Sequence, residues 1–175
     1  MYIKVTNKTP LNFITLNDAK RQLNIVDDTT DNIHISDLIK AAMELSEIAT
    51  HRKLSPCTVN LVVRACSTIR VPFGDVETIT SVTTVDAAPV NYTFNEITQQ
   101  ITITDTSILS DDELMIVYDV GYDDPNKVPH AIKMGAKILI SDFYENREST
   151  VVGASVADIP LGAKALFDSQ KLDYL

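Results

Sequence analysis

Apolar residues recur at the spacing of an α-helix in two long stretches of the chain. After an Asp-rich turn at residues 27–31, apolar positions follow at three- and four-residue steps to near Arg52, which is the pattern of one buried helix face. They are Ile35, Leu38, Ile39, Ala42, Leu45 and Ala49. A second helix follows Pro129, a residue that suits a first helical turn because it has no N–H to leave unpaired. Its apolar stripe is formed by Ile132, Ala136, Leu139 and Phe143.

Gly135 lies inside this second helix. A glycine there costs about 1 kcal/mol relative to alanine. Either the close approach of another helix or simple tolerance explains it.

Local end signals predict two shorter helices. Thr15 is placed as the N-cap of a helix over residues 16–23, and Asp18 at its third position interacts favourably with the helix dipole. Pro160 opens a last helix that runs to about Gln170. The apolar side of this last helix is formed by Leu161, Ala165 and Leu166.

In the middle of the chain the pattern changes to a period of two, which is typical of strands with one buried face. From Cys57 to Val71 the odd-numbered positions are mostly apolar, and the even-numbered ones are mostly polar. Further strands rich in Thr and Val are predicted near residues 79–85, 91–95, 97–104 and 113–120, with a hairpin turn at Asn95-Glu96. The order of elements predicts an α+β fold: a helical bundle of about four helices, with an antiparallel β insertion between the second and third helices.

The same order divides the chain into three parts. Residues 1–54 hold the N-terminal helices, residues 55–127 form an acidic, β-rich insertion, and residues 128–175 hold the C-terminal helices that complete the helical domain.

Composition is that of an ordinary globular protein. The chain has 175 residues, of which 45% are hydrophobic and 22% charged, enough for a core that needs no disulfide or metal. The first residues lack the pattern of a signal peptide, and no apolar run approaches the length of a membrane span. We therefore expect a protein that is cytosolic when made and has no membrane partner. Cys57 and Cys66 match no redox or zinc spacing and are expected to be free thiols.

Charge is distributed unevenly. The net charge is -9, which argues against binding nucleic acid by phosphate neutralisation. Residues 71–126 contain eleven acidic residues and no Lys or Arg. This block is either a solvated acidic surface, a surface to which DNA does not adhere, or one that meets a basic partner.

Searches for catalytic and metal-binding motifs give only decoys. Residues 153–157, GASVA, approximate the GxSxG nucleophile elbow, but no His follows Ser155 in the chain. An EF-hand aligned on Asp27 fails because Asn32 and Leu38 occupy the positions that need Gly and Glu. The acidic residues at 111–113 and 123–124 are read as solvated turns in preference to a cation site. We expect no enzyme, no catalytic residue, no cofactor and no metal.

A polar cluster, Tyr144 to Glu148, ends the helix that follows Pro129. It is either a solvated helix C-terminus, with Arg147 near the last carbonyls, or a contact with another protein. The adjacent apolar pair Val151 and Val152 favours the contact, because such a pair in a segment of small residues needs a surface to pack against.

Five pieces of the sequence occur in an order shared with one known family. They are ITLNDAKRQLNI, DLIKAAMELSEIATHRKL, VETITSVTTVD, VPHAIKMGAKILISDFYENRESTVVG and IPLGAKALF. Together they resemble the head–tail connector proteins, also called adaptor or head-completion proteins, of long-tailed bacteriophages and gene transfer agents. The fourth piece is the most specific, and the resemblance spans nearly the whole chain. Phe143 replaces a frequent Trp, and the ending SQKLDYL lacks the Pro-Tyr-Arg of the family, which puts in doubt a basic contact by the last residues.

The resemblance implies a structural virion protein. Members of this family form a ring, expected to contain twelve subunits, that docks under the portal protein and presents a platform for the stopper or tail. The ring extends the DNA channel after packaging, and DNA passes without specific binding. The protein would be found in the virion neck, and in the host cytoplasm during assembly. Another neck or tail ring component, such as the stopper or a tail terminator, is the alternative, followed by a small hydrolase using Ser155.

The polar cluster then becomes a contact with a neighbouring subunit or the portal, and residues 149–158 a hinge that precedes the last helix. The expected partner and oligomer interface consists of Tyr144, Glu145, Asn146, Arg147, Glu148, Val151, Val152, Leu161, Leu166 and Phe167.

Overall fold

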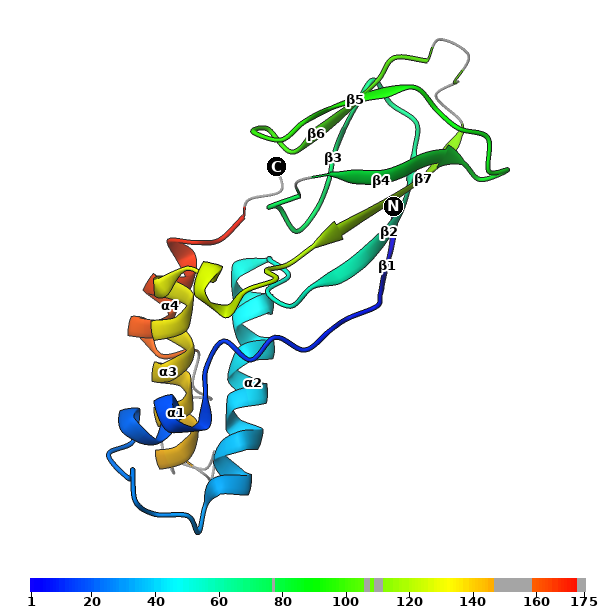
Figure 1. Cartoon of the computed structure of the whole chain (residues 1–175). Coiled ribbons are helices and arrows are strands. Elements are labelled where there is room, and N and C mark those ends of the chain that lie inside the picture. The colour runs from blue at the N-terminus through cyan, green and yellow to red at the C-terminus, as the bar shows by residue number, and fades with distance from the viewer. Residues whose placement is uncertain (77, 106–107, 109–111, 147–158, 173–175) are drawn as a thin grey trace. The chain divides into compact units, whose positions relative to one another are not determined.

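The chain folds into an α+β structure whose strands all pair antiparallel. The computed structural model describes residues 1–76, 78–105, 108, 112–146 and 159–172, and in these residues it contains four α-helices and two β-sheets (Figure 1). The chain divides into two compact units. We call Met1–Leu11, Arg52–Asp123 and Leu172–Leu175 the β unit, and Asn12–His51 and Asp124–Lys171 the helical unit. Every helix in the described residues lies in the helical unit, and every strand lies in the β unit.

The helical unit begins with the predicted cap. α1 spans Leu16–Gln22, and the Thr15 side chain accepts a hydrogen bond from the N–H of Asp18 at 3.1 Å. The Asp18 carboxylate accepts the N–H of Thr15 in return, which completes a capping box. The predicted N-cap and helix are therefore confirmed.

The longest helix, α2, spans Asn32–Thr50 and ends at His51 in a left-handed conformation. Three of its six predicted face residues, Ile35, Ile39 and Ala42, are buried. Leu38, Leu45 and Ala49 are half-buried. After the short 3-10 turn η1, Pro125–Lys127, the helix α3 spans His130–Glu145 and buries Ile132, Ala136 and Leu139, as its pattern predicts.

The last helix, α4, spans Leu161–Asp168 and packs on α3. A Cβ built on Gly135 of α3 would lie 2.6 Å from Cε1 of Phe167, so the two helices meet where α3 has no side chain. The close approach of a second helix, one of the two explanations for Gly135, is confirmed. The predicted face of α4 is wrong, because Leu161 and Ala165 are exposed and the buried pair is Ala163 and Phe167. Phe167 fills the space above Gly135, and Ala163 lies one turn earlier on the same face.

The β unit contains two antiparallel sheets. One has the order β1-β2-β7-β4 and the other β3-β6-β5. The strands are β1 Tyr2–Thr6, β2 Cys57–Arg64, β3 Thr68–Arg70, β4 Ile79–Thr84, β5 Tyr92–Asn95, β6 Gln100–Ile103 and β7 Glu113–Val120. Side chains of both sheets form one apolar core, which includes Val59 and Ile116 of the first and Ile69 and Ile101 of the second.

The alternating stretch from Cys57 to Val71 is two strands, where the pattern alone suggests one. The alternation continues across Ala65 to Ser67, but the chain changes sheets there, from β2 to β3. Cys57 is buried and Cys66 exposed. The strand β1 was not among the predicted elements; it pairs with β2, with Tyr2 opposite Val62.

Candidate interaction surfaces

The end of α3 is fastened to the beginning of α2. The hydroxyl of Tyr144 donates a hydrogen bond to Oδ2 of Asp31 at 2.8 Å. The Tyr144 ring also lies near the ring of His34, with centroids 6.2 Å apart and planes tilted by 40°. Tyr144 is half-buried. Its hydroxyl is thus bound within the helical unit, to the residue that precedes α2.

Two polar atoms beside this contact are buried without a hydrogen-bond partner in the described part of the chain. They are Oδ1 of Asn32 and Nε2 of His34, both in the first turn of α2. A buried polar atom without a partner costs free energy. The first turn of α2 therefore has an unmet hydrogen-bonding demand next to Tyr144, at atoms that are closed to solvent.

The remaining predicted interface residues lie in different environments. Glu145 and Asn146 are exposed, and the Asn146 N–H donates to the Asp142 carbonyl at 2.9 Å, which closes the helix. Arg147, Glu148, Val151 and Val152 lie outside the described residues, as do Ser155 and the predicted hinge at 149–158.

On α4 the predicted interface residues differ in exposure. Leu161 is 85% exposed, and Leu166 is half-buried. Phe167 is 1% exposed and packs within the helical unit. Leu161 is thus the member of this set that offers apolar surface on α4.

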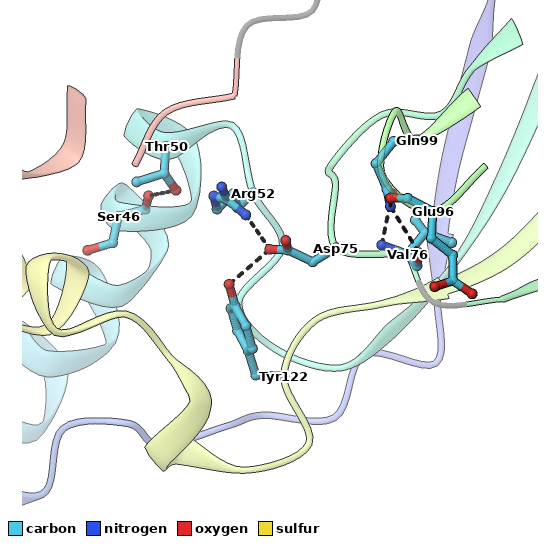
Figure 2. A network of polar contacts seen from close by, with 8 residues as sticks. All are labelled: Ser46, Thr50, Arg52, Asp75, Val76, Glu96, Gln99 and Tyr122. Carbon is cyan, nitrogen blue, oxygen red and sulfur yellow. Dashed lines mark hydrogen bonds and ion pairs between the residues drawn. The ribbon is translucent and has the colours of Figure 1, made fainter. Parts of the chain in front are cut away.

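A polar network in the β unit gathers residues that are far apart in the sequence. Asp75 pairs with the guanidinium of Arg52 and accepts a hydrogen bond from the Tyr122 hydroxyl at 2.9 Å (Figure 2). The loop that carries Asp75 is tightly wound, because Phe73, Gly74 and Asp75 all have positive φ, at 72°, 54° and 56°. A Cβ on Gly74 would overlap the side chain of Leu172.

The same loop also contacts Lys53. Nζ of Lys53 lies 5.1 Å from the centre of the Phe73 ring, within range of a cation–π interaction. We call residues 73–75 with Arg52, Lys53, Tyr122 and Leu172 the clasp. The clasp holds three segments of the β unit, at Arg52, Tyr122 and Leu172. Each of them is next in sequence, or nearly so, to a boundary between the two units.

The clasp changes the ionisation of Tyr122. The pKa of Tyr122 is raised to about 12, mainly by burial and then by the neighbouring Asp75 carboxylate, through charge repulsion and through its hydrogen bond with the hydroxyl. Arg52 opposes the shift. The neutral phenol is therefore the stable form at neutral pH, and it acts as a hydrogen-bond donor.

Sequence reasoning missed the clasp. Asp75 counted only as one of the acidic residues of the 71–126 block, and Arg52 only as a helix end. The one local signal was the Gly74-Asp75 pair, which is typical of turns. Nothing in the sequence near Asp75 points to Tyr122.

The acidic block is largely at the surface of the β unit. Its exposed members in the described chain are Asp75, Asp86, Glu96, Glu113, Asp119 and Asp123. In the described residues we find no group of three or more His, Cys, Asp or Glu side chains that is arranged to hold a metal ion. No described helix is long and apolar enough to cross a membrane.

Comparison with known proteins gives a likeness of fold. No protein-family model matches the sequence, and no curated protein matches it. A solved structure described as "Virion of native gene transfer agent (GTA) particle" contains a similar chain, with a TM-score of 0.73 and 17% identity. Chains described as "Neck of empty GTA particle computed with C6 symmetry" and "Neck of native GTA particle computed with C12 symmetry" give TM-scores of 0.71 and 0.65 at 16% identity. Each match covers 100% of this chain and 97% of the other, so this chain has, over its full length, the fold of chains found in gene transfer agent particles.

Proposed function

We propose that this protein is a structural component of the neck of a tailed virion or gene transfer agent, and within the neck the head–tail connector (adaptor). The observation that carries the proposal is the likeness of fold to neck chains over the whole length. The sequence resemblance, which rests on separate evidence, favours the same family. No catalytic step is part of this function.

In this proposal each subunit combines a helical domain with a β insertion. Residues 1–54 and 128–175 provide the helices and residues 55–127 the insertion. The separation of the chain into a helical and a β unit supports this division, with the difference that residues 1–11 group with the strands.

The subunits assemble into a ring of twelve between the portal and the stopper or tail. Six- and twelve-fold symmetry in the descriptions of two similar structures supports a ring. Twelve copies with a net charge of -9 would carry about -108, a field that keeps DNA from adhering to the channel as it passes. The protein would thus occupy the virion neck after assembly in the host cytoplasm.

We assign the contact with a neighbouring subunit or the portal to the end of α3 and the residues after it. The exposed positions of Glu145 and Asn146 at the end of α3 support this assignment. Arg147→Ala is expected to weaken ring formation or portal binding, measured by co-sedimentation with purified portal. Lys164→Ala, on the exposed side of α4, is a matched loss of charge. Equal binding by all three proteins would contradict the assignment.

The decisive experiment is electron microscopy of particles made with the gene inactivated. We expect tailless heads that packaged DNA and then lost it, with normal particles restored by a plasmid copy. Normal tailed particles without the protein would refute the neck function.

A stopper or tail terminator is the second candidate, because the descriptions of the similar structures name the neck and not the individual neck component. A tag on this chain, imaged in complete particles, separates the candidates. Density directly against the portal is expected for the adaptor, and density on the tail side for the others.

A further inference from the structure

The hairpin between β5 and β6 presents an apolar side chain at its tip. Ile97 is 95% exposed. Oδ1 of Asn95 accepts the N–H groups of Ile97 and Thr98 at 3.0 and 3.1 Å, so the turn is closed by its own side chain. The predicted two-residue turn at Asn95-Glu96 is therefore a longer loop, since Asn95 pairs with Gln100.

A second side chain fastens this tip to the body of the β unit. Nε2 of Gln99 donates to the carbonyls of Glu96 and Val76 at 2.6 and 3.0 Å, and Oε1 of Gln99 accepts the Val76 N–H at 2.9 Å (Figure 2). An apolar side chain on a loop held in this way loses little conformational entropy when it binds a partner. Single exposed apolar residues are common, but this one is both fully exposed and held in place.

The same unit has an open hollow of about 310 Å³ at its first strand. It is lined by Met1, Tyr2, Val62, Val63, Arg64 and Glu113. Met1 and Tyr2 are 78% and 65% exposed. β1 is an edge strand of its sheet. At the opposite edge, Thr83 of β4 forms an isolated β-bridge with Pro89.

The tip and the hollow belong to different sheets of the β unit, the tip to the sheet β3-β6-β5 and the hollow to β1, β2 and β7. β3 and β6 are paired so that Arg70 is opposite Gln100, next to the tip, and Thr68 is opposite Thr102. Arg64, at the end of β2, precedes Thr68 in the chain and therefore lies toward the end away from the tip. In Figure 1 the closed end of the β5–β6 hairpin is at the left of the β unit, and the N-terminus lies apart from it, beside β2. Ile97 thus reaches such a hollow only on another molecule.

Charge favours the same pairing. The exposed Glu96 adjoins Ile97, and the exposed cation Arg64 lines the hollow, with Glu113 opposite Arg64 as the one acidic group among the lining residues. The alternative, antiparallel pairing of β1 with a second β1, would centre on Lys4 and place two lysines opposite each other, which is unfavourable.

We propose that Ile97 of one subunit docks into the hollow around Tyr2 and Val62 of a second copy of this chain, with Glu96 beside Arg64. The contact joins two different surfaces, the kind that closes into a ring or continues as a filament. The inference rests on the proposed function only for the ring; the contact itself is a property of the purified chain.

Disulfide trapping tests the contact. In a Cys66→Ser background, which removes the exposed thiol, the variant carrying Tyr2→Cys and Ile97→Cys is expected to oxidise into a ladder of oligomers. A mixture of the two single variants is expected to stop at dimers, because each chain then has one half of the contact. Tyr2→Cys with Ile33→Cys is the matched control, since Ile33 is 81% exposed but lies in α2.

The trapping is performed both on the concentrated purified chain and on particles. Absence of the ladder in both, or an equal ladder from the control, would overturn the inference. If the protein is missing from particles, the proposed function fails, and the purified chain alone decides the contact. If particles contain the protein but no ladder forms in either preparation, the proposed function is untouched and the contact is wrong.

Charge exchange tests the role of Glu96. In the trapping variant, Glu96→Lys is expected to slow formation of the ladder several-fold, and Arg64→Glu added to it is expected to restore the rate. Both residues are exposed, so neither change disturbs the core. An unchanged rate in Glu96→Lys would contradict the pairing with Arg64.

Discussion

Each unit contains one contact that joins segments far apart in the sequence, and the two contacts are of different kinds. In the helical unit, α3 and α4 meet where the buried Phe167 ring lies over Gly135. In the β unit, the loop at residues 73–75 is held by Asp75, which pairs with Arg52 and Tyr122.

The difference determines which conditions each of these two contacts responds to. An apolar contact depends on shape and area and is little affected by salt or pH. The clasp depends on charge, and the side chain of Asp75 is 46% exposed, so solvent screening keeps its ion pair weak. We therefore expect large stability effects from size changes in the helical unit, and small, pH-dependent effects from changes in the clasp.

The largest effect is expected from Phe167→Ala. Removing a fully buried ring leaves a cavity and costs about 3–5 kcal/mol. Urea unfolding followed by helical circular dichroism measures the loss. Leu161→Ala on the same helix, at an 85% exposed position, is the control and is expected to change stability by less than about 0.5 kcal/mol. Equal effects of the two changes would contradict the claim that the contact of Phe167 with Gly135 stabilises the helical unit.

Gly135→Ala is expected to destabilise the helical unit by a smaller amount. The new Cβ would lie 2.6 Å from the Phe167 ring, and overpacking of this kind costs about 1–3 kcal/mol, against a gain of about 1 kcal/mol in helix propensity. Combining Gly135→Ala with Phe167→Leu is expected to cost less than the sum of the single changes, because the two residues are in contact. Strict additivity in the same unfolding experiment would show that they do not meet.

Thr15→Ala tests a polar contact in the helical unit. Loss of the N-cap is expected to cost about 1 kcal/mol. The hydrogen bonds from Thr15 are the main reason why the pKa of Asp18 lies below its usual value. A lowered pKa contributes stability above the unfolded value of 3.8 and loses it as the pH falls. The difference in unfolding midpoint between wild type and Thr15→Ala should therefore shrink on acidification, and a constant difference would contradict this linkage.

The smallest effect on stability is expected from Asp75→Asn. The change should lower the pKa of Tyr122 from about 12 toward 10.0, but only in part, because burial is the larger cause. A raised pKa means that the unfolded chain loses the proton first. The contribution of Tyr122 to stability is thus fully present below pH 10.0 and lost as the pH rises toward about 12.

Tyrosinate absorbance during alkaline titration measures this pKa, with Tyr122→Phe identifying the signal among six tyrosines. An unshifted titration in Asp75→Asn would mean that the hydroxyl and the carboxylate do not interact.

Much of the helical unit is predictable from the sequence. The cap at Thr15 and the buried faces of α2 and α3 depend on residues three or four positions apart, which are neighbours in any helix. The predicted buried face of α4 was wrong, because a helix of eight residues has too few apolar positions to identify a stripe. Phe167 is buried in preference to Leu161 because its ring fits against Gly135 of α3, a contact that the sequence of α4 does not reveal.

The candidate interaction surfaces are less predictable. The polar cluster at Tyr144 was visible as a pattern, but its bond to Asp31 joins residues 113 positions apart. The clasp joins Asp75 to Arg52 and Tyr122 over 23 and 47 positions. Ile97 was predicted to begin the strand over residues 97–104, which is wrong, because β6 begins at Gln100 and Ile97 lies in the loop before it. Its exposure and the hollow at Tyr2 were not foreseen.

The sequence by itself determined the class of fold, the positions of the helices and of most strands, and the acidic character of the middle of the chain, because these follow from local periodicity and composition. Only the tertiary structure decided that Tyr2–Thr6 is an edge strand, that the stretch from Cys57 to Val71 serves two sheets, and that Phe167 is buried. The physical reason is that strand register, loop anchoring and burial are set by contacts between distant residues, whose cost in chain entropy is offset only when the whole unit folds.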